Sequence, residues 1–221
     1  MHSKTFGAIV ATLAATLAPH AAQAQTTYAN TVLQMLRGTA PGDFAPPQFY
    51  GGSYPGSFPV ALTDDQARAA VLGAPDGNFL SLPGPALGES GSAFQGAYVN
   101  LGFGADFSSD TVITLHELGN NYESAHLFIW TNNGGNLQLD VTRDASDDIT
   151  VDLRPYAGVL TSLGATAWRS VAIGGIDDLG ASRGFDLDSV SITAVPEPST
   201  TALLLGGLGV LGWAARRTRR A

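Results

Sequence analysis

The acidic side chain at position 117 is the first candidate for chemistry in this sequence. In the alternating segment 111–118, Glu117 has the same parity as Ile113 and Leu115, so in a strand its carboxylate points toward the core. A buried carboxylate is costly unless it meets an arginine, backbone N–H groups or a metal ion. The sequence therefore predicts a salt bridge or a hydrogen-bonded loop at Glu117, and it leaves a metal site open.

A second acidic candidate lies at the start of the last apolar segment, where the alternation changes phase. Phe185 and Leu187 have odd parity, whereas Val190 and Ile192 have even parity. A strand can turn all four side chains inward if one extra residue is inserted between the two pairs. We therefore expect a bulge or turn near 188–189.

This bulge would make Asp186 and Asp188 project together, opposite the apolar side chains. Carboxylate oxygens at a strand entry are the hard ligands that Ca²⁺ takes in proteins. We therefore predict a structural Ca²⁺ held by Asp188, with Asp186 or Glu117 contributing. The alternative is that these aspartates are solvated surface acids.

Aromatic side chains are the candidates for sugar binding, because their flat apolar faces can stack on sugar rings. The candidates are Trp130, Trp168, Tyr156, Tyr50 and Tyr54. Trp130 is expected to pack in the core, and core packing is the alternative role of Trp168. Tyr156 follows a proline in a predicted loop and is the best exposed candidate, so Tyr156 and Trp168 are the predicted glycan contacts.

Motifs for catalysis are absent from the sequence. The two histidines between 25 and 198, His116 and His126, form no H-E-x-x-H pattern, and no G-x-S-x-G elbow occurs. We therefore expect a domain without enzymatic activity. A glycan-active hydrolase is the alternative, because it needs two carboxyl groups roughly 5–10 Å apart and the chain has 19 acidic residues. A structural protein without a ligand is the third class.

A two-residue period from 79 onward predicts the elements that position these side chains. Apolar and polar residues alternate in the segments 98–103, 111–118, 126–131, 137–142, 149–153, 171–173 and 190–194. Short strands at this spacing predict an all-β fold, an antiparallel β-sandwich over 63–194. A capping-box pattern at 63–66 predicts one short helix that ends at Leu72. The Gly-, Pro- and aromatic-rich segment 25–62 is expected to precede the sandwich as an ordered loop or a flexible arm.

The charge distribution and the absence of cysteine limit the partners and sites of this chain. The net charge is -8, but six basic and 19 acidic residues between 25 and 198 give that stretch a charge of -13. A surface this acidic repels phosphate backbones, so we expect no nucleic-acid partner. The absence of cysteine removes disulfides, thiolate catalysis and Cys-ligated zinc.

The first 24 residues have the three parts of a secretory signal. Lys4 supplies the positive start, 6–18 is an apolar run, and the Ala-Gln-Ala triplet at 22–24 fits a signal peptidase site. We place the cut between Ala24 and Gln25. A buried first helix is the alternative.

The last 27 residues, 195–221, carry a second targeting pattern. The motif Pro196-Glu197-Pro198 precedes an uncharged apolar stretch at 199–215, which predicts a transmembrane helix. A basic cluster follows this stretch and consists of Arg216, Arg217, Arg219 and Arg220. The positive-inside rule places the cluster in the cytoplasm and the acidic domain on the outer side of the membrane.

This three-part order resembles the PEP-CTERM sorting signal. The resemblance implies recognition by a membrane exosortase and removal of the tail near 196–198. The domain would first be anchored to the inner membrane, facing the periplasm, and would then be attached at the cell surface or released. The resemblance also implies a link to exopolysaccharide and biofilm in Gram-negative bacteria. A plain membrane anchor is the alternative.

Three loose motifs, at 71–77, 116–119 and 184–190, resemble jelly-roll domains of other PEP-CTERM proteins, which are similar to carbohydrate-binding modules. The resemblance covers about 64–194. It implies a jelly-roll-like matrix or surface component that contacts polysaccharide without cleaving it. Such modules often hold a structural Ca²⁺ near the place predicted for Asp188.

Overall fold

The structure is a computed structural model in which the chain divides into two compact units. It describes residues 24–37, 48–55, 60–84, 96–119, 123–143, 148–176 and 184–195, together with 206–209 and 216. One unit is Gln25–Val195, and the other consists of Met1–Ala24 with Pro196–Ala221. Each unit is considered by itself, and the strands described below all belong to the first.

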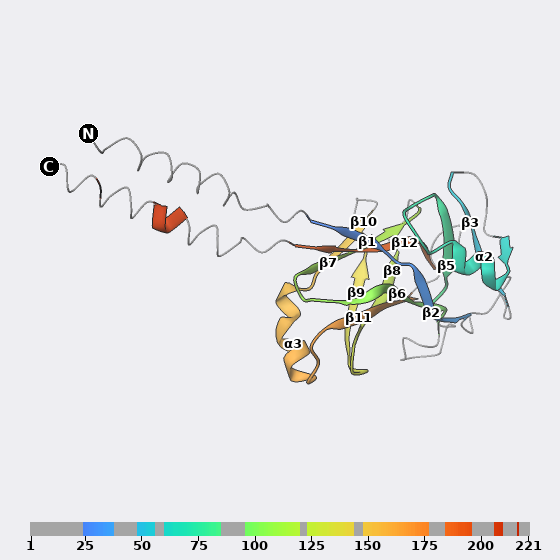
Figure 1. The fold of residues 1–221 in the computed structure, drawn as a ribbon. Coiled ribbons are helices and arrows are strands. Elements are labelled where there is room, and N and C mark those ends of the chain that lie inside the picture. Colours follow the sequence, from blue (N-terminus) through green and yellow to red (C-terminus); the bar gives the residue numbers. More distant parts are fainter. Residues whose placement is uncertain are drawn as a thin grey trace. The chain divides into compact units, whose positions relative to one another are not determined.

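Strands make up most of the described part of the unit Gln25–Val195 (Figure 1). They are β1 (Thr26–Tyr28), β2 (Thr31–Leu36), β3 (Phe49–Ser53), β4 (Val60–Leu62), β5 (Asn78–Leu82), β6 (Tyr98–Phe107), β7 (Thr111–Glu117), β8 (Ser124–Thr131), β9 (Asn136–Thr142), β10 (Asp148–Asp152), β11 (Trp168–Gly175) and β12 (Phe185–Ala194). The short helices are α2 (Asp64–Ala69), α3 (Ala157–Ser162) and the 3-10 helix η1 (Arg154–Tyr156).

The strands form two sheets in which each described pairing is antiparallel. The seven-stranded sheet has the order β10-β7-β12-β5-β3-β4, and β1 also pairs with β12. The five-stranded sheet has the order β2-β6-β11-β8-β9. The all-β antiparallel class predicted from the alternation is therefore confirmed.

Both sheets contribute to one hydrophobic core. Leu80 and Ile113 come from the seven-stranded sheet, Leu101 and Ile173 come from the five-stranded sheet, and all four side chains have 0% exposure. Burying one such side chain contributes about 1.5–3 kcal/mol. A one-residue slip would turn a whole apolar set out of the core, so the core fixes the register of each strand.

Strand β12 contains the irregularity that its sequence predicts. Leu187 pairs with Glu117 and Ser189 pairs with His116, so Asp188 is an extra residue opposite β7. Leu187 and Val190 are nevertheless both fully buried. The bulge therefore returns apolar side chains to the core on both sides of Asp188.

Helix α2 begins at the predicted capping box. The Gln66 backbone N–H donates to Thr63 Oγ1 at 3.2 Å, and the Thr63 N–H donates to Gln66 Oε1 at 2.9 Å. The helix ends at Ala69, one turn before the predicted end at Leu72. It packs against β3 and β4, and Figure 1 shows α3 at the other end of the same unit.

The described parts of the segment 25–62 contribute strands to the sheets, so the expected boundary between an N-terminal segment and a sandwich at 63–194 is wrong. Strands β1, β3 and β4 join the seven-stranded sheet, and β2 joins the five-stranded sheet. At Gly51 a Cβ would lie 2.0 Å from the backbone oxygen of Phe79, so this close strand pairing requires glycine. The glycine content of this segment predicts a loop, but here glycine is present because neighbouring strands approach closely.

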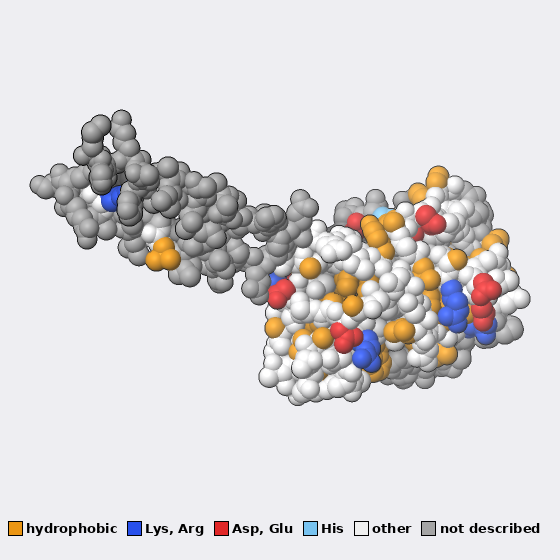
Figure 2. All heavy atoms as spheres, in the orientation of Figure 1, with side chains coloured by type: hydrophobic (Ala, Val, Ile, Leu, Met, Phe, Trp, Pro, Cys, Tyr) orange, Lys and Arg blue, Asp and Glu red, His pale blue; other side chains and the backbone are white. Residues whose placement is uncertain are grey.

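Charged side chains on the surface in view are sparse and mostly lie beside a charge of opposite sign (Figure 2). The described exposed pairs include Arg154–Asp152 at 2.7 Å and Arg169–Asp106 at 3.3 Å. Exposed pairs of this kind contribute little to folding stability. The core and the sheet pairings therefore hold this unit together.

None of the described helices is long and apolar enough to cross a membrane. The predicted signal helix at 1–24 and the predicted transmembrane helix at 199–215 fall mostly outside the described residues.

Candidate functional site

Four ionisable side chains are buried together where β7 ends and β12 begins. Glu117 is 0% exposed, Glu123 2%, Asp186 5% and Arg143 6%. Glu117 ends β7, Glu123 directly precedes β8, Arg143 directly follows β9, and Asp186 lies at the start of β12. These four residues are called the carboxyl cluster below.

Arginine is the partner of Glu117. Arg143 Nη1 lies 2.7 Å from Glu117 Oε2, and the same nitrogen donates to the backbone oxygen of Gly119. Glu117 points into the core beside Ile113 and Leu115, as its parity predicts. The sequence predicts an arginine, backbone N–H groups or a metal ion as the partner of this carboxylate, and the structure contains the arginine.

The carboxyl group of Glu123 is protonated at neutral pH. Burial, together with the nearby negative charges of Asp186 and Glu117, raises the pKa of Glu123 to about 9. The Glu123 carboxyl group is hydrogen-bonded to the Glu117 carboxylate and to the Asp186 backbone N–H. Asp186 Oδ1 accepts a hydrogen bond from Ser81 Oγ at 2.8 Å, so each acid of the cluster has a protein partner.

Asp188 has its own partners, which lie outside the carboxyl cluster. It is 2% exposed, and its carboxylate accepts hydrogen bonds from the backbone N–H groups of Asp76 at 3.2 Å and Gly77 at 3.0 Å. Burial raises the pKa of Asp188, and these two N–H groups oppose that shift. Asp188 therefore anchors the turn before β5.

The donors predicted for Ca²⁺ do not converge on one point. Glu117 is paired with Arg143, while Asp186 and Asp188 bind different partners. Within the described ranges, no group of three or more His, Cys, Asp or Glu side chains is arranged to hold a metal ion. In this arrangement Glu117, Asp186 and Asp188 each have a protein partner, which is the Arg143 guanidinium, the Ser81 hydroxyl and backbone N–H groups, respectively.

A second candidate site lies on the face of the five-stranded sheet that points away from the core. One row of cross-strand neighbours on this face, called the outer row below, runs from β9 to β2 and consists of Asn136, Trp130, Ser170, Gly102 and Thr31. Three adjacent strand spacings separate Trp130 from Thr31, a span of about 14 Å. The row therefore contains an amide, an indole and two hydroxyl-bearing side chains in a line, and one of these, Ser170, is only 2% exposed.

Trp130 lies on the outer face and packs against a small outer cluster, and not in the main core as expected. Its neighbours Leu127 and Ile129 take the core side of β8, so the even positions Phe128 and Trp130 point outward. Trp130 is half-buried against a small cluster of Tyr98, Phe128 and Ala172. Its indole Nε1 has no hydrogen-bond partner within the described part of the chain.

A shallow hollow of about 230 Å³ opens at the β2 and β6 end of the outer row. Its lining includes Thr31, Leu33, Gly102, Asp106 and Arg169. The atoms closest to a Cβ at Gly102 would be those of the Leu33 side chain, at 3.5 Å, so glycine here leaves space that a larger residue would fill. The hollow is therefore lined both by apolar side chains and by the Arg169–Asp106 ion pair.

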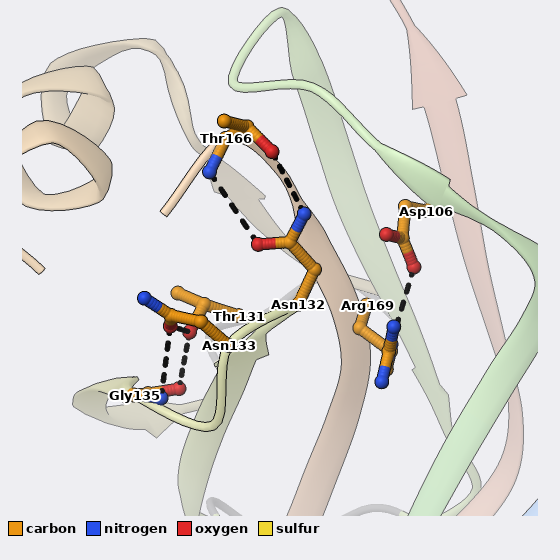
Figure 3. Close-up of polar contacts among 7 residues, drawn as sticks. All are labelled: Asp106, Thr131, Asn132, Asn133, Gly135, Thr166 and Arg169. Carbon is orange, nitrogen blue, oxygen red and sulfur yellow. Dashed lines mark hydrogen bonds and ion pairs between the residues drawn. The ribbon is translucent and has the colours of Figure 1, made fainter. Parts of the chain in front are cut away.

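Polar side chains brace the loops at the end of the sheet that carries this charged pair (Figure 3). Asn132 Nδ2 donates to Thr166 Oγ1 at 2.8 Å, and Asn132 Oδ1 accepts from the Thr166 N–H at 3.4 Å. Thr131 Oγ1 donates to Asn133 Oδ1 at 2.6 Å. Figure 3 shows Arg169 and Asp106 facing each other from β11 and β6, with Asn132 on the β8 side.

The two predicted glycan contacts differ in accessibility. Trp168 has 0% exposure, and its Nε1 donates to Ser109 Oγ at 3.3 Å, so its assignment as a glycan contact is wrong and it is a core residue. Tyr156 is half-buried at the end of η1 and packs against the core. Tyr54 is 51% exposed in the turn after β3.

The predicted targeting residues fall mostly outside the described residues. Ala24 and Gln25 are described and exposed, and so is Arg216. The residues that are not described are Pro196, Glu197, Pro198, Arg217, Arg219 and Arg220. Sequence reasoning missed Glu123, Arg143 and the outer row, although the excess of polar residues at even positions of β9 was a signal for an outer face.

Comparison with solved structures gives no basis for a function. One match is the crystal structure of an exo-β-1,3-galactanase from Phanerochaete chrysosporium with β-1,3-galactotriose, at 13% identity and a TM-score of 0.31. The match covers 77% of this chain but 29% of that chain. We base no argument on a similarity this low. No curated protein matches the chain significantly.

Comparison with protein-family models identifies the C-terminal signal. A model of the PEP-CTERM protein-sorting motif matches residues 194–220. The match includes the Pro196-Glu197-Pro198 motif, the apolar stretch and the basic cluster. The chain therefore carries a PEP-CTERM sorting motif, which makes it an exported protein that an exosortase sorts to the cell surface.

Proposed function

We propose that this protein is a non-catalytic component of the cell surface or extracellular matrix, and that it contacts exopolysaccharide through the outer row. A signal peptidase cuts after Ala24, the tail anchors the domain in the inner membrane, and exosortase removes that tail. The two sheets form a jelly-roll-like β-sandwich that displays the outer row to the exterior.

The observation that carries this proposal is the row of aromatic and polar side chains beside a hollow on the outer sheet face. Trp130 is half-buried, so part of its indole is exposed on this face, while its Nε1 is buried. Gly102 opens the hollow, and the exposed pair Arg169–Asp106 borders it. Sugars need this combination, because their C–H faces stack on aromatic rings and their hydroxyls bind planar polar groups.

The buried acids support a role without catalysis. Glycosidases place two accessible carboxyl groups on either side of the sugar. Glu117, Glu123 and Asp186 are at most 5% exposed and are satisfied by Arg143, Ser81 and one another. A substrate could not reach them without opening the sheet ends.

Binding to the polysaccharide of the producing cell tests the proposal. The secreted protein is expected to bring down this polysaccharide, and the Arg169→Ala variant is expected to bind about tenfold more weakly, since a charge-assisted hydrogen bond contributes about 1.5–3 kcal/mol. Arg154→Ala is the matched control, because Arg154 forms an equally exposed pair with Asp152 outside the outer row. Equal binding by both variants would contradict the proposed site.

The size of the recovered glycan separates binding from hydrolysis. Polysaccharide incubated with the protein is expected to keep its length distribution on size-exclusion chromatography. Shortened chains would instead support the hydrolase, and failure to bind any glycan on an array would support a structural protein without a ligand.

A further inference from the structure

The carboxyl cluster has the composition of a calcium site but a different source of positive charge. Glu117, Glu123 and Asp186 bring three carboxyl groups into a buried space, where unbalanced negative charge is costly. A divalent cation is the usual solution for oxygen donors of this kind. Here the guanidinium of Arg143 lies among them, 2.7 Å from Glu117 Oε2.

The backbone around Arg143 is shaped to hold its guanidinium. Gly119 has a φ of 153°, and a Cβ at this position would lie 3.0 Å from Glu117 Oε1 and 3.8 Å from Arg143 Nη1. The backbone oxygen of Gly119 accepts a hydrogen bond from the same nitrogen. At the other end, the backbone N–H of Arg143 donates to the backbone oxygen of Glu123 at 3.0 Å. Arg143 is therefore held by its side chain and by its backbone.

The charge balance of the cluster is the one that Ca²⁺ would give. Three carboxylates with Ca²⁺ would carry one net negative charge. Arg143 supplies one positive charge, and the hydrogen bond between the carboxyl groups of Glu123 and Glu117 requires one proton between them, which neutralises a second carboxylate. The arginine and the proton together replace the two charges of the ion.

We propose that Arg143 is the built-in counter-cation of the carboxyl cluster, so the protein needs no divalent cation there and acquires a need for one when Arg143 is removed. Asp188 takes no part in this balance, because its carboxylate is committed to the turn at Asp76 and Gly77. This role of Arg143 is confined to the ends of β7 and β12 and does not depend on glycan binding at the outer row.

Thermal unfolding of the full secreted protein tests this assignment, with calcium chloride or EDTA as the added reagent. The wild-type protein is expected to have the same Tm in both. Arg143→Met is expected to melt several degrees lower in EDTA and to recover part of that loss in millimolar calcium. Arg154→Met is the control, since Arg154 is an exposed arginine in a pair with Asp152 and should give no response to calcium.

Calorimetric titration with calcium chloride gives a second readout. The wild-type protein is expected to bind no calcium at the cluster, whereas Arg143→Met is expected to bind it. A wild-type Tm that falls in EDTA and is restored by calcium would overturn the proposal. A folded Arg143→Met variant without calcium binding would also overturn it.

Arg143→Lys keeps the test decisive if Arg143→Met does not fold. Lysine retains one positive charge, so this variant is expected to stay insensitive to calcium, with a Tm lowered because lysine lacks the guanidinium that contacts both Glu117 and the Gly119 oxygen. A calcium-dependent Tm in Arg143→Lys would contradict the proposal that the positive charge of residue 143 takes the place of a divalent cation.

Discussion

The carboxyl cluster and the outer row satisfy their polar groups in opposite ways. In the carboxyl cluster, burial brings acids together and each finds a partner, such as Arg143 for Glu117 or Ser81 for Asp186. In the outer row, Trp130 is half-buried with a buried Nε1 that has no hydrogen-bond partner among the described residues, and Gly102 leaves a hollow. Titratable residues therefore mark a stabilising site in this fold, whereas the groups left for a ligand lie on the outer sheet face.

The largest expected effect comes from breaking the ion pair of the carboxyl cluster. Glu117→Gln leaves the buried Arg143 without its counter-charge, so we expect the free energy of unfolding to fall by about 3–5 kcal/mol. Urea unfolding measures this loss. Asp152→Asn, which breaks the exposed pair with Arg154, should leave the midpoint nearly unchanged. Equal losses in both variants would remove the distinction between buried and exposed pairs.

The next effect is a dependence of stability on pH that belongs to Glu123. Its folded-state pKa is raised to about 9, so its contribution to stability is complete below about 4.5 and is lost as the pH rises through about 9. The slope for one proton approaches about 1.4 kcal/mol per pH unit.

Glu123→Gln should flatten this slope and stabilise the protein at alkaline pH, because the amide keeps a donor toward Glu117 and cannot ionise. Urea unfolding between pH 5 and 9 tests this, with Asp140→Asn as an exposed-acid control. An unchanged slope in Glu123→Gln would show that Glu123 is not the group responsible.

A change in the outer row should affect binding and leave folding intact. Gly102→Val fills the hollow, and β-branched residues suit a strand, so we expect about tenfold weaker polysaccharide binding with little change in Tm. Gly102→Ala is the graded control, because its Cβ would make an ordinary 3.5 Å contact with Leu33. Full binding by Gly102→Val would place the ligand elsewhere.

The smallest effect is expected at the braced loops beside the outer row. Asn132→Ala removes the two hydrogen bonds to Thr166, with an expected loss of about 0.5–1.5 kcal/mol. Chemical denaturation measures this loss, and a paired Thr166→Ala variant in a double-mutant cycle isolates the contact. Additive losses would mean that these side chains do not act as a pair.

Sequence periodicity predicted the parts of this molecule that depend on local alternation. The core-facing Glu117 and the bulge at Asp188 follow from parity within one strand. Arg143 and Glu123 could not be found in this way, because both lie just outside strands and meet Glu117 through sheet pairing. Their contact is a product of topology.

The two tryptophans show where parity fails. In β8, apolar residues occupy both faces, so the alternation could not decide which face holds Trp130. In β11, a register shift between Trp168 and Ser170 places Trp168 and Val171 in the same core despite their different parity. A bulge next to an aromatic residue therefore changes the face of the strand on which its side chain lies.

Indole fluorescence of the secreted, processed protein tests the central claim most directly. With the tail removed, Trp130 on the outer row and Trp168 in the core are the two tryptophans that remain in the sequence. Polysaccharide is expected to shift the emission of the wild-type protein, and Trp130→Phe is expected to lose that shift while it keeps the wild-type Tm within a few degrees. A shift that persists in Trp130→Phe, or polysaccharide binding without any shift, would contradict ligand contact at the outer row.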